Sequence, residues 1–298
     1  MNLMKHKYWF LIFSAAILIP GIVTILVWGM KLSIDFTGGT LLTYKFNAPI
    51  NTGELKEVLD SQGAGVQVIT TNSQTDYSIR TREIQSNDID RVKNAVSAKF
   101  DGAILRSFET VGPVIGRETT KNAAVSLMWA SIGILLYIAY AFRNIPKPYS
   151  SFRFGVSAIL AMLHDAFIVL GVFSILGHFF KIEIDSLFIT AMLTVIGFSV
   201  HDTIVVFDRI RENLNKLPKQ MNFEEVVNYS IVETLSRSLA TSLTVLITLL
   251  SLYLLGGESI KNFVLAMLIG IFSGTYSSIF TASPILVVWE QLISKRAK

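Results

Sequence analysis

Four ionisable residues of interest lie inside hydrophobic runs that are long enough to cross a membrane: Asp165, Asp202, Glu233 and Arg237. A charged side chain within a membrane span is costly and usually serves a function. Arginine stays charged at every physiological pH, whereas a nearby aspartate can bind and release a proton as their separation changes. These residues therefore predict a proton site, which would draw on the membrane potential at about 2.3 kcal/mol per charge per 100 mV.

Asp202 and Arg237 are expected at similar depth in two consecutive spans. Each lies about six residues from the inner end of its apolar run, which corresponds to roughly 9 Å at 1.5 Å per residue. If these spans are adjacent, the two side chains can meet. The alternative to a proton site is a structural ion pair that fixes helix register. Asp165 lies nearer the middle of its span and is either a second proton carrier or a packing residue bonded to a neighbouring hydroxyl.

Other polar residues in the spans have weaker indications of function. His201 precedes Asp202 and is a candidate for the polar lining, although a lone membrane histidine is more often a packing residue. Several hydroxyls of the fifth span can hold water, bond across helices or bond back to their own helix: Ser236, Ser238, Thr241, Ser242 and Thr244. Thr241 and Ser242 are the candidates for the lining. Glu233 is expected near the interface, solvated or paired with Arg209 or Arg211. Small residues of the last span indicate close helix packing: Gly270, Ser273, Gly274, Ser277 and Ser278.

The composition is that of a membrane protein. Of 298 residues, 51% are hydrophobic and 16% charged, whereas a soluble chain carries about 25% charged residues. This excludes a disordered chain, a nucleic-acid-binding domain and an ordinary cytosolic enzyme. The absence of cysteine, the scattering of four histidines and the lack of a P-loop predict no metal and no other cofactor. Six runs of about 20 apolar residues are expected as spans: 8–30, 122–142, 154–177, 186–207, 232–255 and 263–289.

Short-loop charges predict the orientation. Twelve lysines and arginines lie in one set of loops and termini, and two, Lys181 and Lys261, lie in the opposite short loops. Because the positive side is cytoplasmic, both termini are expected in the cytoplasm and 31–121 outside it. The first run is too long for a cleaved signal and is expected to be a retained anchor.

The stretch 31–121 is expected to fold as a small ferredoxin-like α+β domain. Its patterns predict strands at 40–46, 66–71, 77–83 and 103–111 and helices at 51–61 and 86–100, in the order βαββαβ. Its charged residues are mixed along solvated faces, so binding or mechanical coupling is favoured over catalysis. The expected division is therefore 1–30 with the first span, 31–121 outside, and 122–298 with the other five spans.

Five motifs together resemble the SecF branch of the SecD/SecF family, protein-export membrane subunits of the RND superfamily. They are Asp35-Phe36-Thr37-Gly38-Gly39, Val111-Gly112-Pro113-Val114-Ile115-Gly116, Ser199 to Asn213 with Val200-His201-Asp202-Thr203 near its start, Ser236-Arg237-Ser238-Leu239-Ala240-Thr241-Ser242, and Gly274-Thr275-Tyr276-Ser277-Ser278-Ile279-Phe280. The resemblance covers essentially the whole chain in order.

The resemblance implies a subunit of the bacterial cytoplasmic (inner) membrane that assembles with SecD beside the SecYEG channel. It implies that proton-motive force helps to move an emerging polypeptide across the bilayer. Asp202 and Arg237 match the family's proton-coupling residues, and Asp165 matches a third-span position. Gly38 and Gly39 would form a bend after the first span. Two other functions stay open: a proton-driven transporter of a small molecule or lipid, and a structural scaffold for SecD.

Overall fold

The computed structural model describes residues 2–71, 73–218 and 220–296. Its contacts divide the chain into two compact units. The helical unit comprises Met1–Met30, Ser126–Ile182 and Leu187–Lys298, and the soluble unit comprises Lys31–Val125 and Glu183–Ser186.

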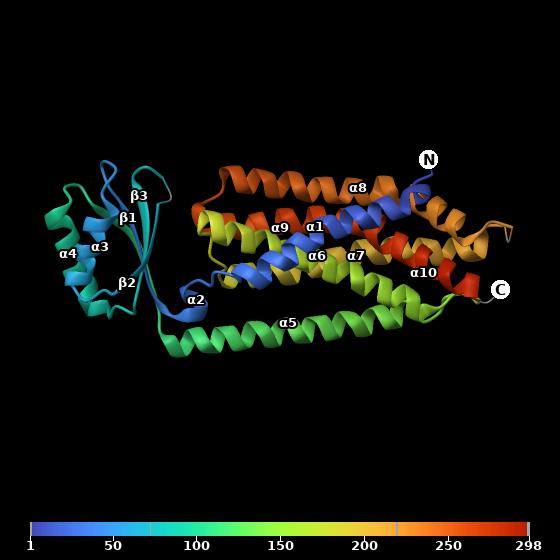
Figure 1. Cartoon of the computed structure of the whole chain (residues 1–298), viewed down its shortest axis with the longest axis horizontal. Helices are drawn as coiled ribbons and strands as arrows, with labels where there is room; N and C mark the ends of the chain where they lie inside the picture. Colours follow the sequence, from blue (N-terminus) through green and yellow to red (C-terminus); the bar gives the residue numbers. More distant parts are fainter. Residues whose placement is uncertain (1, 72, 219, 297–298) are drawn as a thin grey trace. The chain divides into compact units, whose positions relative to one another are not determined.

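Six helical segments are long and apolar enough to cross a membrane, as expected. Figure 1 traces them as α1 (Lys7–Trp28), α5 (Pro113–Ala141), α6 (Ser151–Phe180), α7 (Ser186–Lys216), α8 (Phe223–Leu255) and a last span made of α9 (Glu258–Ser277), a π-helical turn (Ser278–Ala282) and α10 (Ser283–Arg296). A short 3₁₀ turn, Met4–His6, precedes α1.

Several helices extend beyond their apolar runs. α5 begins nine residues before the expected span, at Pro113, and proline suits the first turn of a helix. α7 continues to Lys216, and α8 begins at Phe223 with a capping box formed by Asn222 and Glu225. Hydropathy marks the apolar part of a helix, whereas hydrogen bonding and capping decide where the helix ends.

The core of the helical unit is formed around α6 and α7. Half or more of the most apolar window of each is buried, against 6% in α5 and 17% in α8. α1 crosses α6 closely at Gly21 and Gly171, and α9 approaches α7 at Gly270, which lies against Val195. The expected close packing of the small-residue span is therefore present, and much of α5 and α8 is left uncovered by the described residues.

The soluble unit has the expected βαββαβ order. It consists of β1 (Gly39–Lys45), α3 (Thr52–Ser61), β2 (Val66–Thr71), β3 (Asp76–Thr81), α4 (Ser86–Lys99) and β4 (Ile104–Val111). The strands form one antiparallel sheet in the order β2-β3-β1-β4, and each element ends within two residues of its prediction. Figure 1 shows α3 and α4 on one face of this sheet.

Alternating residues of the sheet meet the apolar faces of the two helices. Leu42 of β1 pairs with Ile79 of β3, and both are fully buried. Leu55 of α3 and Val96 of α4 complete the same core. A period of two in the strands and about four in the helices brings these side chains to one layer.

Candidate functional site

Asp165 lies fully buried in the middle of α6, where it accepts hydrogen bonds from three hydroxyls and contacts one imidazole. Ser273 Oγ donates to its Oδ1 at 2.7 Å, and His164 Nδ1 lies 3.0 Å from the same oxygen. Ser199 Oγ donates to Oδ2 at 2.5 Å, and Ser277 Oγ donates to Oδ2 as well. We call Ser199, Ser273 and Ser277 the serine cluster.

The serine cluster joins α7 and α9 to the Asp165 carboxylate of α6. Ser199 comes from α7 and the other two serines from α9, one turn apart. A carboxylate has about four acceptor positions, so three hydroxyls and one imidazole N–H would fill them. The expected hydroxyl bond to Asp165 is present, and the arrangement suits either a packing residue or a proton carrier.

Asp202 lies one helical turn after Ser199 on α7 and is also buried. Its Oδ2 accepts a hydrogen bond from Ser278 Oγ at 2.8 Å. Ser278 opens the π-helical turn and directly follows Ser277. Two neighbouring residues of the last span therefore contact the two buried aspartates of α6 and α7.

The expected meeting of Asp202 and Arg237 does not occur in the part of the chain that the structure describes. The two residues are equally far from the turn between their helices, because Asp202 lies 14 residues before the end of α7 and Arg237 lies 14 residues after the start of α8. Arg237 is nevertheless exposed, and the next residue, Ser238, is the buried one. Successive helical residues point about 100° apart, so equal depth does not bring two side chains together.

The other candidates for the polar lining divide between exposed and buried positions. His201 and Thr241 are exposed, and the Thr241 hydroxyl donates to the Arg237 carbonyl of its own helix at 3.0 Å. Ser242 is buried, and its hydroxyl has no hydrogen-bond partner among the described residues. Of these three, only Ser242 faces the interior of the helical unit.

Sequence reasoning assigned the serines of the last span to close packing and missed their contacts with the aspartates. Ser273 and Ser277 are spaced by four residues, and Ser199 precedes Asp202 by three. This spacing on one helix face was the available signal. It does not reveal which carboxylate the hydroxyls meet. The serines of the last span lie 76 to 112 residues along the chain from the aspartates that they contact.

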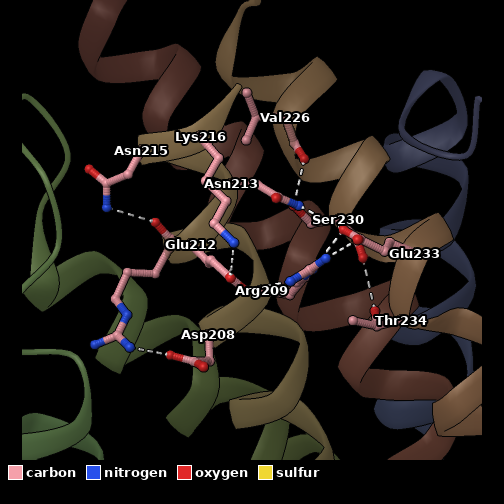
Figure 2. A network of polar contacts seen from close by, with 11 residues as sticks. Asp208, Arg209, Glu212, Asn213, Asn215, Lys216, Val226, Ser230, Glu233 and Thr234 are labelled. Carbon is pink, nitrogen blue, oxygen red and sulfur yellow. Dashed lines mark hydrogen bonds and ion pairs between the residues drawn. The ribbon is translucent and has the colours of Figure 1, made fainter. Parts of the chain in front are cut away.

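A second polar network joins the end of α7 to the start of α8 (Figure 2). Arg209 forms a two-pronged ion pair with Glu233, with Nε 2.6 Å from Oε2. This confirms the expected pairing of Glu233. Asn213 donates to Ser230 Oγ and to Glu233 Oε2, each at 3.0 Å. Arg209 also contacts Glu212, so the network holds the two helix ends together.

The motif Asp35–Gly39, here called the GG segment, organises one edge of the soluble unit. Asp35 Oδ2 accepts from the Ser186 amide at 2.8 Å. Phe36 is buried, and the Thr37 hydroxyl accepts from Arg80. Arg80 also donates to the Leu32 carbonyl at 2.8 Å and to Glu183 at 3.1 Å, so its guanidinium joins three stretches of chain.

The two glycines of the GG segment are required by backbone conformation and by space. They follow α2 (Ile34–Thr37), and their φ angles are +75° at Gly38 and +123° at Gly39. A Cβ at Gly38 would lie 2.9 Å from Pro113 Cα, and one at Gly39 would lie 2.6 Å from the Thr81 carbonyl oxygen. The bend expected from the resemblance is present, between α2 and β1.

Comparisons with known proteins agree along nearly the whole chain. Residues 91–292 match the family described as "Protein export membrane protein SecD/SecF, C-terminal", and residues 25–50 match the "SecD/SecF GG Motif". The chain is 47% identical to the protein translocase subunit SecF of Thermobaculum terrenum and 40% identical to that of Anaerolinea thermophila. Each alignment covers 97% of this chain and 94% of the relative.

The fold is similar to that of a larger protein. The crystal structure of SecDF from Thermus thermophilus superposes with a TM-score of 0.84 at 35% identity, covering 98% of this chain and 39% of SecDF. The chain thus spans well under half of that protein. The family matches cover most of the sequence, and the SecF relatives align over nearly their full length. This multi-pass membrane protein therefore belongs to the SecD/SecF family and is a SecF subunit of the protein-export machinery, a transport component rather than an enzyme.

Proposed function

We propose that this SecF subunit uses the proton gradient to assist polypeptide translocation, with Asp165 and Asp202 as proton-carrying groups. The observation that carries the proposal is that both carboxylates are buried and that neither forms an ion pair with lysine or arginine among the described residues. A buried charge without a cation is costly, so binding a proton is the direct way to neutralise it. The neighbouring groups of the two aspartates are hydroxyls and one imidazole.

The proposal also assigns a partner-facing role to Arg237. Along α8 an exposed stripe repeats every three or four residues: Arg237, Thr241, Thr244, Thr248 and Ser251. The four hydroxyls bond to carbonyls of their own helix, but within the described chain no carboxylate neutralises the arginine. A charged side chain in a span normally faces protein or a water-filled cavity. The exposed arginine therefore supports a second protein with a carboxylate on this face.

SecD is the proposed partner on the α8 face. In the SecDF relatives of Thermus thermophilus and Bacillus subtilis, this chain aligns with 35% and 37% of the protein. The name SecDF indicates that a SecD part is fused to a SecF part in those proteins. In this picture the chain lies in the inner membrane beside the SecYEG channel, with both termini cytoplasmic. The segment 31–121 faces the emerging polypeptide, between the first span (1–30) and the other five (122–298).

The first test is export of a secreted reporter in cells that carry Asp165→Asn or Asp202→Asn as the sole copy. Assembly is checked by co-purification with SecD. We expect intact assembly and loss of the export that depends on proton-motive force. Asp208→Asn is the matched control, because Asp208 lies on the same helix as Asp202, is exposed and pairs with Arg211. Normal export by both buried-site variants would refute the proton-carrier role and favour a scaffold for SecD.

The α8 face is tested separately with Arg237→Gln and Thr248→Val. We expect Arg237→Gln to lose export, since the proposed partner carboxylate then lacks its cation. Thr248→Val lies on the same stripe and removes only a bond to the Thr244 carbonyl of its own helix, so export should persist. Equal export by both variants would contradict a role for Arg237 opposite a partner carboxylate.

A further inference from the structure

The last membrane span changes its helical geometry at the point where it contacts the two aspartates. α9 ends at Ser277, and residues Ser278–Ala282 form a π-helical turn before α10 begins. Single π turns inside longer helices occur frequently at functional sites. This one is buried, and its Thr281 hydroxyl lies 2.7 Å from Ser14 Oγ of α1.

Ser277 and Ser278 each have two hydrogen-bond acceptors within reach. The Ser277 hydroxyl contacts Asp165 Oδ2, and the Gly274 carbonyl of its own helix lies 3.3 Å away. The Ser278 hydroxyl lies 2.8 Å from Asp202 Oδ2 and 3.2 Å from the Thr275 carbonyl. Ser199 and Ser273 form no hydrogen bond through their hydroxyls other than the one to Asp165 among the described residues. Ser277 and Ser278 therefore differ from Ser199 and Ser273.

We propose that Ser277 and Ser278 are positioning residues that adapt the site to either protonation state of Asp165 and Asp202. When an aspartate is charged, its serine donates to the carboxylate. When the aspartate is protonated, the acid O–H donates to the serine oxygen, and the serine O–H turns to its own helix carbonyl. Every hydroxyl hydrogen then has an acceptor in both states, with one bond in the charged state and two in the protonated state. A proton can therefore bind and leave without creating an unsatisfied buried donor.

The proposal rests on the proton-carrier role of the two aspartates and adds the residues that make the carriers reversible. Ser199 and Ser273 supply fixed donors that hold Asp165 in place. His164 is the titratable group hydrogen-bonded to Asp165, and no titratable side chain is hydrogen-bonded to Asp202 among the described residues. Because His164 can itself change charge, the test includes a His164→Gln variant.

The experiment compares Ser277→Ala and Ser278→Ala in the complex with SecD. The matched control is Thr275→Val, since Thr275 lies on the same helix and its hydroxyl bonds only to the Ile271 carbonyl among the described residues. The first measurement is the pH profile of reporter export into inverted membrane vesicles. Each alanine removes a donor to the charged carboxylate and an acceptor for the protonated acid, so we expect the midpoint to shift by about one pH unit relative to Thr275→Val.

The second measurement is infrared spectroscopy of the protonated carboxyl groups in the purified complex. The bands are assigned by their loss in Asp165→Asn and Asp202→Asn. We expect Ser277→Ala to shift the Asp165 band alone and Ser278→Ala to shift the Asp202 band alone. The His164→Gln profile identifies any part of the pH dependence that belongs to the imidazole, so a serine effect that persists in this background supports the proposal.

The outcomes separate this inference from the proposed function. If the aspartate variants lose export but the serine variants keep the midpoint and bands of Thr275→Val, the positioning role is wrong and the proton-carrier role stands. If the aspartate variants export normally, the proton-carrier role fails, and the positioning role fails with it.

Discussion

Replacing Gly171 by alanine tests how closely α1 and α6 approach each other. A Cβ at Gly171 would lie 2.5 Å from Gly21 Cα and 3.0 Å from the Gly21 carbonyl carbon. Carbon atoms in favourable contact are about 3.5–4.0 Å apart, so the two helices must separate by about 1 Å or more. The obstructing atoms belong to the backbone, and no change of rotamer relieves the contact. Overpacking of this kind costs about 1–3 kcal/mol.

The corresponding substitution on the other helix of this crossing, Gly21→Ala, is expected to have little effect on stability. A Cβ at Gly21 would lie 3.4 Å from Gly171 Cα and 3.6 Å from the Phe167 carbonyl oxygen, which is near ordinary contact. The asymmetry arises because the Cα–Cβ bond of a helical residue has a fixed direction, and a Cβ at Gly171 comes about 0.9 Å closer to the partner backbone than one at Gly21. Gly21→Ala should change the free energy of unfolding by less than about 0.5 kcal/mol.

The assay is denaturant unfolding of the purified chain in mixed micelles, followed by tryptophan fluorescence. Gly133→Ala is the control, because a Cβ there meets nothing within 4 Å. We expect Gly171→Ala to be less stable than the Gly133→Ala and Gly21→Ala variants by about 1–3 kcal/mol. Equal stabilities of the Gly171 and Gly21 variants would refute the geometry of this crossing.

Three further predictions concern other parts of the chain. Burial raises the pKa of Tyr44 to about 12, because the buried site favours the neutral phenol. The contribution of Tyr44 to the stability of the folded unit is therefore fully present below the unfolded pKa of about 10 and is lost as pH rises through 12. Its buried hydroxyl has no described partner; Tyr44→Phe should stabilise the soluble unit by about 1 kcal/mol at pH 7 and by more at pH 11, as measured by hydrogen exchange. A lower stability of this variant at both pH values would contradict the reasoning. Gly39→Ala should destabilise the soluble unit by clearly more than Gly63→Ala. Both glycines have positive φ, but only a Cβ at Gly39 would overlap with backbone atoms. Proteolysis rates of the two variants measure this difference, and equal rates would be inconsistent with it. Glu233→Gln should weaken the connection between α7 and α8 by about 0.5–1 kcal/mol, because the ion pair is partly exposed, and a salt-independent loss of stability would argue against an electrostatic contribution.

Much of the fold was predictable because its signals are local. Runs of apolar residues mark membrane spans, and alternation with a period of two marks strands such as β1 and β3. The soluble unit follows the predicted order because each strand and helix carries its own pattern and the polar turns between them are short. The pairing of Glu233 with Arg209 was also accessible, since both lie near the turn between α7 and α8.

The candidate site was predictable only in part. An aspartate inside an apolar run is visible in the sequence, so Asp165 and Asp202 were identified from their positions. Their hydrogen-bond partners were not identified, because Ser273 and Ser278 reach them from a helix about 75 to 110 residues further along the chain. Serine also has an ordinary explanation in a membrane helix, as a small residue at a close crossing.

By itself, the sequence determined that the chain has six spans, a small α+β domain after the first span and two aspartates inside the bilayer-spanning helices. Only the tertiary structure decided which faces of those helices meet. Arg237 and Ser238 are neighbours at almost the same depth, but a turn of about 100° per residue leaves the arginine exposed and the serine buried. The rotation of a helix about its axis is set by packing against other helices. For this reason Asp202 contacts Ser278 and not Arg237.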